Sequence, residues 1–96
     1  DLALEDCNKA LQLLANNAPI LNSRGFVYFR MGKFAVAIAD FSRALAANPK
    51  QASSLYVRGS AKLKSGDFRG GKPDIAAAEK LDPKVADTYE GYGVTP

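Results

Sequence analysis

A 34-residue period runs through this 96-residue chain and limits the folds available to it. The segment 18–51 recurs as the segment 52–85, and matched positions such as Gly25 and Gly59 hold the same residue. A period of this length is typical of helical repeats, whose single units are too small to bury their own apolar faces and therefore stack on their neighbours. Such a stack offers a shared surface for function and no obvious catalytic pocket.

The composition argues against several classes of function. The net charge of +3 is spread along the chain, there is no histidine, and Cys7 is the single cysteine. Without histidine the usual base for a serine or cysteine nucleophile is missing, and one cysteine cannot form an internal disulfide. No run of about 18 apolar residues is present to span a bilayer. We therefore expect no enzyme, no cofactor, no metal site and no membrane segment, and the weak charge disfavours nucleic acid as a partner.

Apolar and small residues recur at helical spacing in both copies, with a break at Gly32 in the first copy and at Gly66 in the second. Each copy therefore predicts two helices joined by a tight turn. The second helix of each copy is expected to end just before Pro49 or Pro83, because the residue preceding a proline is pushed out of the helical region.

The second helix of the second copy has a weak start. Gly70 and Gly71 each cost up to about 1 kcal/mol relative to alanine inside a helix. Pro73 is tolerated in a first helical turn but not in a helix interior. We therefore expect regular helix only from about Gly71 or Lys72, with residues 67–70 irregular.

The two ends of the chain continue the period as partial copies. Residues 1–17 align with the second half of a unit, and a terminal helix is expected from Pro83 or Lys84 to about Tyr92. The chain is thus predicted to be one domain of about six helices. Its parts are the second helix of a truncated repeat (1–17), two full repeats (18–51 and 52–85) and a capping helix with a tail (86–96).

The spaced residues resemble the tetratricopeptide repeat, whose pattern is W-x2-L-G-x2-Y, then A-x3-F, then P. The first full copy reads Leu21-x2-Arg24-Gly25-x2-Tyr28, then Ala37-x3-Phe41, then Pro49. The second reads Leu55-x2-Arg58-Gly59-x2-Lys62, then Gly71-x3-Ile75, then Pro83. The resemblance covers almost the whole chain and implies an all-α fold, a right-handed α-α superhelix of antiparallel helix pairs. The chain departs from the pattern by having no tryptophan, by Lys62 in an aromatic position, and by Pro73.

Small residues are expected where the two helices of a unit cross closely. These are Gly25, Ala37, Ala44, Gly59, Gly71 and Ala78. Larger apolar residues are expected to fill the space between units, namely Phe34, Phe41, Phe68 and Ile75.

An arginine and an aspartate also recur at the repeat period. Arg24 and Arg58 occupy a position that is usually leucine in the family, and the acids are Asp6, Asp40 and Asp74. The planar, bidentate guanidinium suits a structural ion pair repeated along the stack. The pairing is left open between one within a unit, as in Arg24 with Asp40, and one across units, as in Asp6 with Arg24.

In the family that the chain resembles, the first helices of successive units line a concave groove that holds a peptide or helix of a partner. The resemblance therefore implies a non-catalytic protein-protein interaction scaffold, and aromatic and arginine side chains are favoured at binding hot spots. The groove candidates carried over to this chain are Asn22, Phe26, Phe29, Arg30, Tyr56, Ser60, Leu63 and Lys64.

Two other binding functions are disfavoured. One subgroup of the family holds the C-terminal carboxylate of heat-shock chaperones with lysine, arginine and asparagine side chains, but the corresponding positions here hold Ser23, Ser53 and Val57. Repeats that read RNA need variable polar residues in many consecutive units, and only two full units are present.

Self-association is the main alternative function. Leu2, Leu4, Leu11 and Leu14 lie in a helix that would pack on a preceding helix in a complete repeat, so part of its apolar face is expected to be uncovered. We therefore expect a homo-oligomer, such as a two-fold dimer, to form through this end.

The C-terminal tail gives a weaker indication. The ending Tyr92-Gly93-Val94 resembles that of small bacterial repeat proteins, which implies a bacterial origin and leaves cytoplasm and periplasm both open. The nearby residues Asp87, Tyr89, Glu90 and Tyr92 are expected either to cap the last core layer or to extend the groove.

Overall fold

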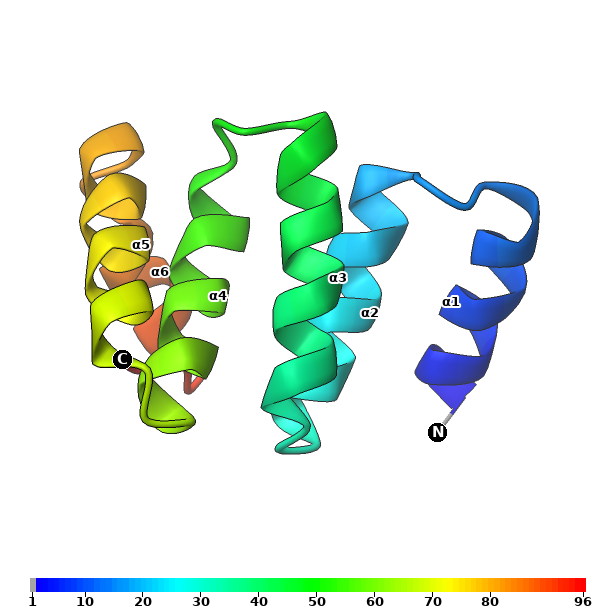
Figure 1. Cartoon of the computed structure of the whole chain (residues 1–96), viewed down its shortest axis with the longest axis horizontal. Coiled ribbons are helices and arrows are strands. Elements are labelled where there is room, and N and C mark those ends of the chain that lie inside the picture. The colour runs from blue at the N-terminus through cyan, green and yellow to red at the C-terminus, as the bar shows by residue number, and fades with distance from the viewer. Residues whose placement is uncertain (1) are drawn as a thin grey trace.

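The computed structural model describes residues 2–96, and that part of the chain is all-helical (Figure 1). Its six helices are packed as adjacent antiparallel pairs, which confirms the predicted fold class. They are α1 (Leu2–Leu13), α2 (Ala18–Arg30), α3 (Phe34–Ala47), α4 (Ala52–Lys64), α5 (Phe68–Leu81) and α6 (Val85–Glu90).

The helices follow one another along the molecule in chain order. α2 packs on α3 and α4 packs on α5, α3 joins the two pairs by packing on α4, and α1 extends the row by packing on α2. α6 returns over α4 and α5. In Figure 1, α1 forms one end of the row while α5 and α6 form the other, so the two chain termini lie at opposite ends.

The helix boundaries follow from local chemistry. The Asn17 side chain accepts a hydrogen bond of 3.0 Å from the Ile20 N–H and so caps α2, with Pro19 in the first turn. Gly32 and Gly66 end α2 and α4 with φ values of +75° and +90°, a region that glycine enters without steric cost. The predicted turns are therefore present at both positions.

The prediction that regular helix begins only at Gly71 or Lys72 is wrong, because α5 begins at Phe68. The Asp67 side chain caps this helix by accepting a 2.9 Å hydrogen bond from the Gly70 N–H. Pro73 lies inside the helix, where its missing N–H leaves the carbonyl of Arg69 without the usual donor. Both Arg69 and Pro73 are exposed, so water can hydrate that carbonyl.

The small residues lie at the close helix crossings, as predicted. Ala37, Ala44 and Ala78 are almost completely buried. A Cβ atom on Gly71 would lie 2.7 Å from the Leu63 side chain and 2.9 Å from the carbonyl oxygen of Gly59. α5 can therefore approach α4 this closely only because residue 71 has no side chain.

The prediction for the larger apolar residues holds in part. Phe41 is buried and Phe34 and Ile75 pack against the core, but Phe68 is 60% exposed. Phe34 meets the ring of Phe29 edge-on, with 5.6 Å between ring centroids. In the second unit Leu63 takes the position of Phe29 and packs over Gly71. Phe68 therefore lacks the ring contact that Phe34 makes in the first unit.

The two arginines pair with the aspartates of their own units. Arg24 donates to Asp40 through Nε and Nη2, both at 2.7 Å, and Arg58 donates to Asp74 in the same way at 2.8 Å. Lys62, in the position expected to be aromatic, also pairs with Asp74 at 2.9 Å. The within-unit pairing is therefore the observed one.

A third hydrogen bond from each arginine crosses to the preceding unit. Arg24 Nη1 donates to Asn8 in α1 at 3.0 Å, and Arg58 Nη1 donates to Ser42 in α3 at 3.2 Å. Neutral side chains of the preceding unit therefore accept these hydrogen bonds, whereas the across-unit alternative predicted an aspartate as the partner.

The terminal helix and the exposed end agree with the sequence in outline. α6 begins at Val85 and ends at Glu90, and Tyr92 lies in the turn that follows. Val94 then returns to the core and is buried. At the other end Leu2 is 78% and Leu13 is 87% exposed, whereas Leu11 is buried within the core.

Within residues 2–96 no helix is long and apolar enough to cross a membrane. The same residues contain no group of three or more histidine, cysteine, aspartate or glutamate side chains that could hold a metal ion.

Candidate partner-binding groove

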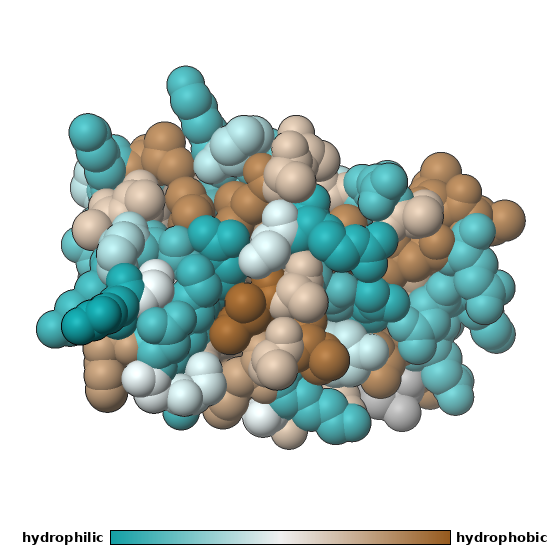
Figure 2. Space-filling view, in the orientation of Figure 1, coloured by the Kyte–Doolittle hydropathy of each residue, from teal (hydrophilic) through white to brown (hydrophobic). Residues whose placement is uncertain are grey.

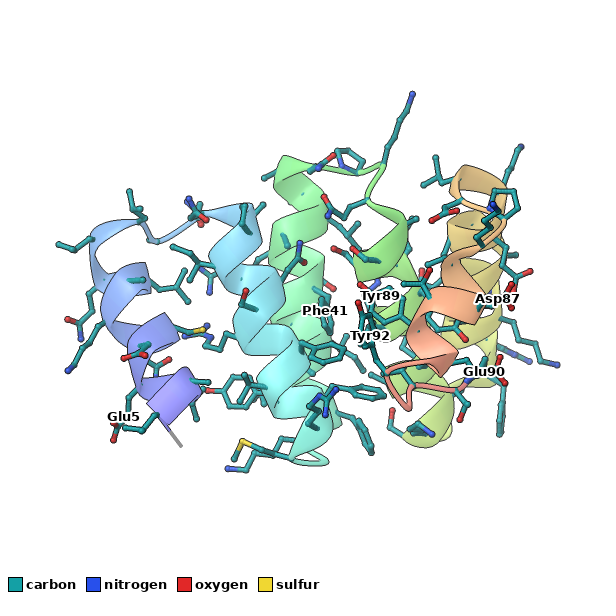
Figure 3. All side chains as sticks on the ribbon, turned by 180° about the vertical axis from the view of Figure 1, so that it is seen from behind. Glu5, Phe41, Asp87, Tyr89, Glu90 and Tyr92 are labelled. Atoms are coloured by element: carbon teal, nitrogen blue, oxygen red, sulfur yellow. The ribbon has the colours of Figure 1, made fainter. Side chains whose placement is uncertain are left out.

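A pocket of about 500 Å³ opens between α2 and the C-terminal segment that contains α6. Figure 3 shows the molecule from this side, with Phe41, Tyr89 and Tyr92 lying near one another at its centre. The lining residues are Asn22, Ser23, Phe26, Arg30, Phe41, Ser53, Ser54, Val57, Tyr89 and Tyr92.

One wall of the pocket is a single face of α2. Asn22, Phe26 and Arg30 are spaced four residues apart, so they lie one above another on that face. The guanidinium of Arg30 lies over the Phe26 ring, 4.8 Å from its centroid, and donates a long hydrogen bond of 3.4 Å to the carbonyl oxygen of Tyr92. Arg30 therefore sits where the α2 wall meets the opposite wall.

The opposite wall is aromatic and comes from the C-terminal segment. The Tyr89 ring lies 6.3 Å from that of Phe26 and 5.7 Å from that of Tyr92, measured between centroids. Tyr89 also stands 5.8 Å from the ring of Tyr56 in α4, which it covers. Tyr89 therefore caps the core, and both Tyr89 and Tyr92 line the pocket. Their role in a binding groove stays a prediction.

The remaining surface of the pocket joins neutral polar groups to an apolar floor. Ser54 in α4 donates a 2.7 Å hydrogen bond to Asn22 Oδ1 in α2 and so connects the first helices of the two units. Phe41 and Val57 are buried beneath the opening. A ligand would find hydroxyl and amide groups at one end, aromatic rings in the middle and a guanidinium at the other end.

The eight groove candidates fall into three groups. Asn22, Phe26 and Arg30 line the pocket together. Leu63 and Lys64 instead border a separate shallow hollow beside the exposed Phe68. The other three candidates are buried, which corrects the expectation that they face outward.

Those three are buried for specific reasons. Phe29 is 8% exposed because it packs against Phe34. Tyr56 is 2% exposed beneath Tyr89, and burial, followed by the charges of Glu90 and Glu79, raises the pKa of its phenol. Ser60 is fully buried, and its hydroxyl has no hydrogen-bond partner within residues 2–96. None of the three can contact a partner without movement of the neighbouring side chains.

Several lining residues were not among the eight candidates. Ser23, Ser53 and Val57, which correspond to positions of the carboxylate clamp, all line the pocket without adding a charge. Tyr89 and Tyr92, which also line the pocket, belong to the C-terminal residues for which the sequence predicts either a cap on the core or an extension of the groove. Ser54 carries no signal in the sequence, because its role depends on its hydrogen bond to Asn22.

Comparison with known proteins agrees with this fold. Residues 18–51 match the family model of the tetratricopeptide repeat. Over 82 residues, 85% of the chain, the sequence is 33% identical to RNA polymerase II-associated protein 3 of Xenopus tropicalis, and over 85 residues, 88% of the chain, it is 26% identical to the protein SGT1 homolog of Bos taurus. Residues 18–51 are therefore a tetratricopeptide repeat, and the helix pairs of the described chain are consistent with a domain of this kind, which is in general a protein-protein interaction module.

The chain corresponds to only a small part of these relatives. It spans 12% of the Xenopus tropicalis protein and 25% of the Bos taurus protein. The protein SGT1 homolog of Homo sapiens is 25% identical over 80 residues, which are 83% of the chain and 22% of that protein. These relatives are vertebrate proteins, and the bacterial origin inferred from the tail stays a prediction.

Proposed function

We propose that this chain is a single, non-catalytic interaction domain that binds a peptide or helix of a partner protein in the pocket between α2 and the α6 segment. The observation that carries the proposal is the lining of that pocket, in which Phe26, Tyr89, Tyr92 and Arg30 meet. The few residues that contribute most of the binding energy at protein interfaces are enriched in tryptophan, tyrosine and arginine. The volume of about 500 Å³ also lies within the range of known ligand pockets, roughly 300–1,000 Å³.

The proposal narrows the groove predicted from the sequence. Asn22, Phe26 and Arg30 remain partner-binding candidates, and Tyr89 and Tyr92 join them from the C-terminal segment. Phe29, Tyr56 and Ser60 support the groove from within the core. The chaperone-tail function is not proposed, because the clamp positions Ser23, Ser53 and Val57 bring no positive charge to the pocket.

Affinity capture with the natural full-length protein tests the proposal. A variant carrying Phe26→Ala and Tyr92→Ala removes two ring contacts of the pocket, and we expect it to lose a defined set of the captured proteins. Phe68→Ala is the matched control, because Phe68 and Tyr92 are both aromatic and both 60% exposed but only Tyr92 lines the pocket. An unchanged set of captured proteins, with the helical circular dichroism retained, would contradict a binding function for this pocket.

Self-association through α1 is a second candidate, and the exposure of its leucines favours it. Leu2, Leu13 and Leu14 are 78%, 87% and 54% exposed, and Figure 2 shows apolar surface gathered at the α1 end of the molecule. Exposed apolar clusters of this kind commonly bind a partner surface. Light scattering at rising concentration tests this, with a monomer mass throughout counting against it and Leu13→Glu expected to abolish any dimer.

A further inference from the structure

The charges of the groove-lining helices are one-sided. α2 and α4 together contain no aspartate or glutamate, and they carry Arg24, Arg30, Arg58, Lys62 and Lys64. A groove lined by a single sign of charge concentrates ligands of the opposite sign. The question is which of these cations remains available to a ligand.

Ion pairs with aspartates of the second helices of the units engage three of these five cations. Arg24 pairs with Asp40 of α3, and Arg58 and Lys62 pair with Asp74 of α5. Arg30 forms no ion pair within residues 2–96 and is exposed at the pocket. The hydrogen bond that Arg30 donates to the carbonyl oxygen of Tyr92 is long and uses one N–H group, so most of its five N–H donors stay free for a ligand.

The C-terminal wall does not supply the missing negative charge. Tyr89 and Tyr92 line the pocket, whereas Asp87 and Glu90 of the same segment do not. In Figure 3 the two tyrosines point toward Phe41 while the two acids lie away from it. Arg30 is therefore the charged residue of a pocket that contains no acid, and a carboxylate would complement it.

The spacing along α2 sets the size of the ligand. Asn22 and Arg30 are eight residues apart, which corresponds to about 12 Å along the helix axis. An extended peptide covers that distance with about four residues. The central position faces Phe26 and Tyr89, whose rings are 6.3 Å apart and favour a large apolar side chain. The amide of Asn22 and the nearby serine hydroxyls can bond to the peptide backbone.

On the basis of the proposed function, we propose that the pocket binds an internal acidic segment of a partner protein. A bulky apolar side chain of that segment packs against Phe26 and Tyr89, and an aspartate or glutamate a few residues away pairs with Arg30. An internal segment fits better than a chain terminus, because the pocket has a single cation, and the positions that would clamp a terminal carboxylate hold Ser23, Ser53 and Val57.

Selection from a random 12-residue peptide library on phage tests this inference directly. The peptides are fused at their C-terminal ends to the coat protein, so every carboxylate offered by the peptide comes from a side chain. On the wild-type domain we expect enrichment of aspartate or glutamate close to a leucine, methionine or aromatic residue. Enriched peptides without acidic residues would overturn the acidic-segment inference and leave the binding function standing, whereas the absence of any enrichment would overturn both.

Substitutions of Arg30 then assign the charge preference to one residue. Arg30→Glu is expected to weaken a selected acidic peptide by about tenfold or more, equivalent to about 1.4 kcal/mol, and to favour lysine or arginine in a repeated selection. Arg30→Gln is expected to remove the preference for acid without creating one for base. Lys80→Glu is the matched control, because Lys80 is exposed on α5 and does not line the pocket.

The same substitutions can also show that Arg30 does not cause the preference for acidic peptides. Equal loss of binding by Lys80→Glu and Arg30→Glu would mean that net charge, and not the pocket, selects the peptide. Salt dependence gives an independent readout, since binding through Arg30 is expected to weaken with ionic strength in the wild type and to lose that dependence in Arg30→Gln. An affinity that is insensitive to salt in both proteins would overturn the pairing.

Discussion

Arg24 in α2 holds both carboxylate oxygens of Asp40 in α3 through two hydrogen bonds of 2.7 Å. The side chain of Asp40 is only 4% exposed, whereas that of Arg24 is 19% exposed. Arg58 and Asp74 repeat this arrangement 34 residues later. Each unit of the stack therefore closes its helix pair with the same buried, bidentate ion pair, and the hydrogen bonds to Asn8 and Ser42 join it to the unit before.

Removing the arginine from this pair is expected to be more damaging than removing both partners. Arg24→Met keeps the length of the side chain but leaves the Asp40 carboxylate buried without a partner, at a cost of about 3–5 kcal/mol in the free energy of unfolding. Combining Arg24→Met with Asp40→Ala removes the uncompensated charge, so the double variant is expected to recover part of that loss. Urea unfolding followed by circular dichroism measures the wild type, the single variants Arg24→Met and Asp40→Ala, and the double variant. Costs that simply add in the double variant would contradict a coupled pair.

The ion pair of the second unit makes stability depend on acid pH. Burial by itself raises the pKa of Asp74, but the hydrogen bonds and charges of Arg58 and Lys62 outweigh burial, so the pKa of Asp74 lies below its ordinary value. An acid whose pKa is lowered by folding stabilises the folded state above its unfolded pKa of about 3.9 and loses that contribution as the pH falls through its folded pKa.

The difference in unfolding free energy between the wild type and Asp74→Asn reports this contribution. We expect the difference to be constant from about pH 5 to 7 and to shrink as the pH falls below about 4, because both proteins then carry a neutral group at position 74. Urea titrations at a series of pH values measure it. A difference that stays the same down to pH 2 would show that Asp74 is not stabilised in its ionised form.

Much of this fold follows from the repeat, because the two copies impose the same packing requirement twice. The close crossing at Gly71, for example, was predictable because Ala37 occupies the same position in the first copy, and the carbonyl of Gly59 leaves no room for a Cβ atom there. The start of α5 does not follow from the proline and glycine costs alone, because the cap at Asp67 supports the first turn.

The pocket was less predictable, because it depends on contacts that a repeat pattern does not contain. If another complete repeat followed α5, Tyr56 would face an open groove. In this structure α6 packs on α4, and Tyr89 covers Tyr56. Phe29 is buried because a phenylalanine follows five residues later, at Phe34, and the two rings meet. Both outcomes depend on individual side chains at one place in the chain.

Pro73 provides a test of how much a proline inside α5 costs in stability. Pro73→Ala restores the N–H that bonds to the Arg69 carbonyl and is expected to stabilise the domain by up to about 3 kcal/mol, since a proline inside a helix costs about that much relative to alanine. Thermal and urea unfolding measure the change. Pro19→Ala is the matched control, because Pro19 lies in the first turn of α2, where no intrahelical hydrogen bond is lost, and we expect little change there. Equal effects at the two positions would contradict a cost that is specific to a proline inside a helix.

The attachment of α6 gives the last prediction, because the pocket exists only while this helix stays on the core. Tyr89 is half-buried and contacts the rings of Phe26, Tyr56 and Tyr92, whereas Tyr92 is 60% exposed and its ring contacts only that of Tyr89 among the ring pairs within residues 2–96. Tyr89→Ala is expected to destabilise the domain by about 2–3 kcal/mol through lost burial and ring contacts, and Tyr92→Ala by less than about 1 kcal/mol.

Unfolding in urea compares the two tyrosine variants, and near-ultraviolet circular dichroism of the tyrosines in the folded proteins reports whether their rings remain ordered. Equal stability of the two variants would mean that the contact between Tyr89 and Tyr56 does not hold α6 on the core. The pocket wall would then be a detachable segment, and a partner could bind by displacing α6 from the groove. A larger loss in Tyr89→Ala instead supports a pocket that is formed before the partner arrives, which lowers the entropic cost of binding.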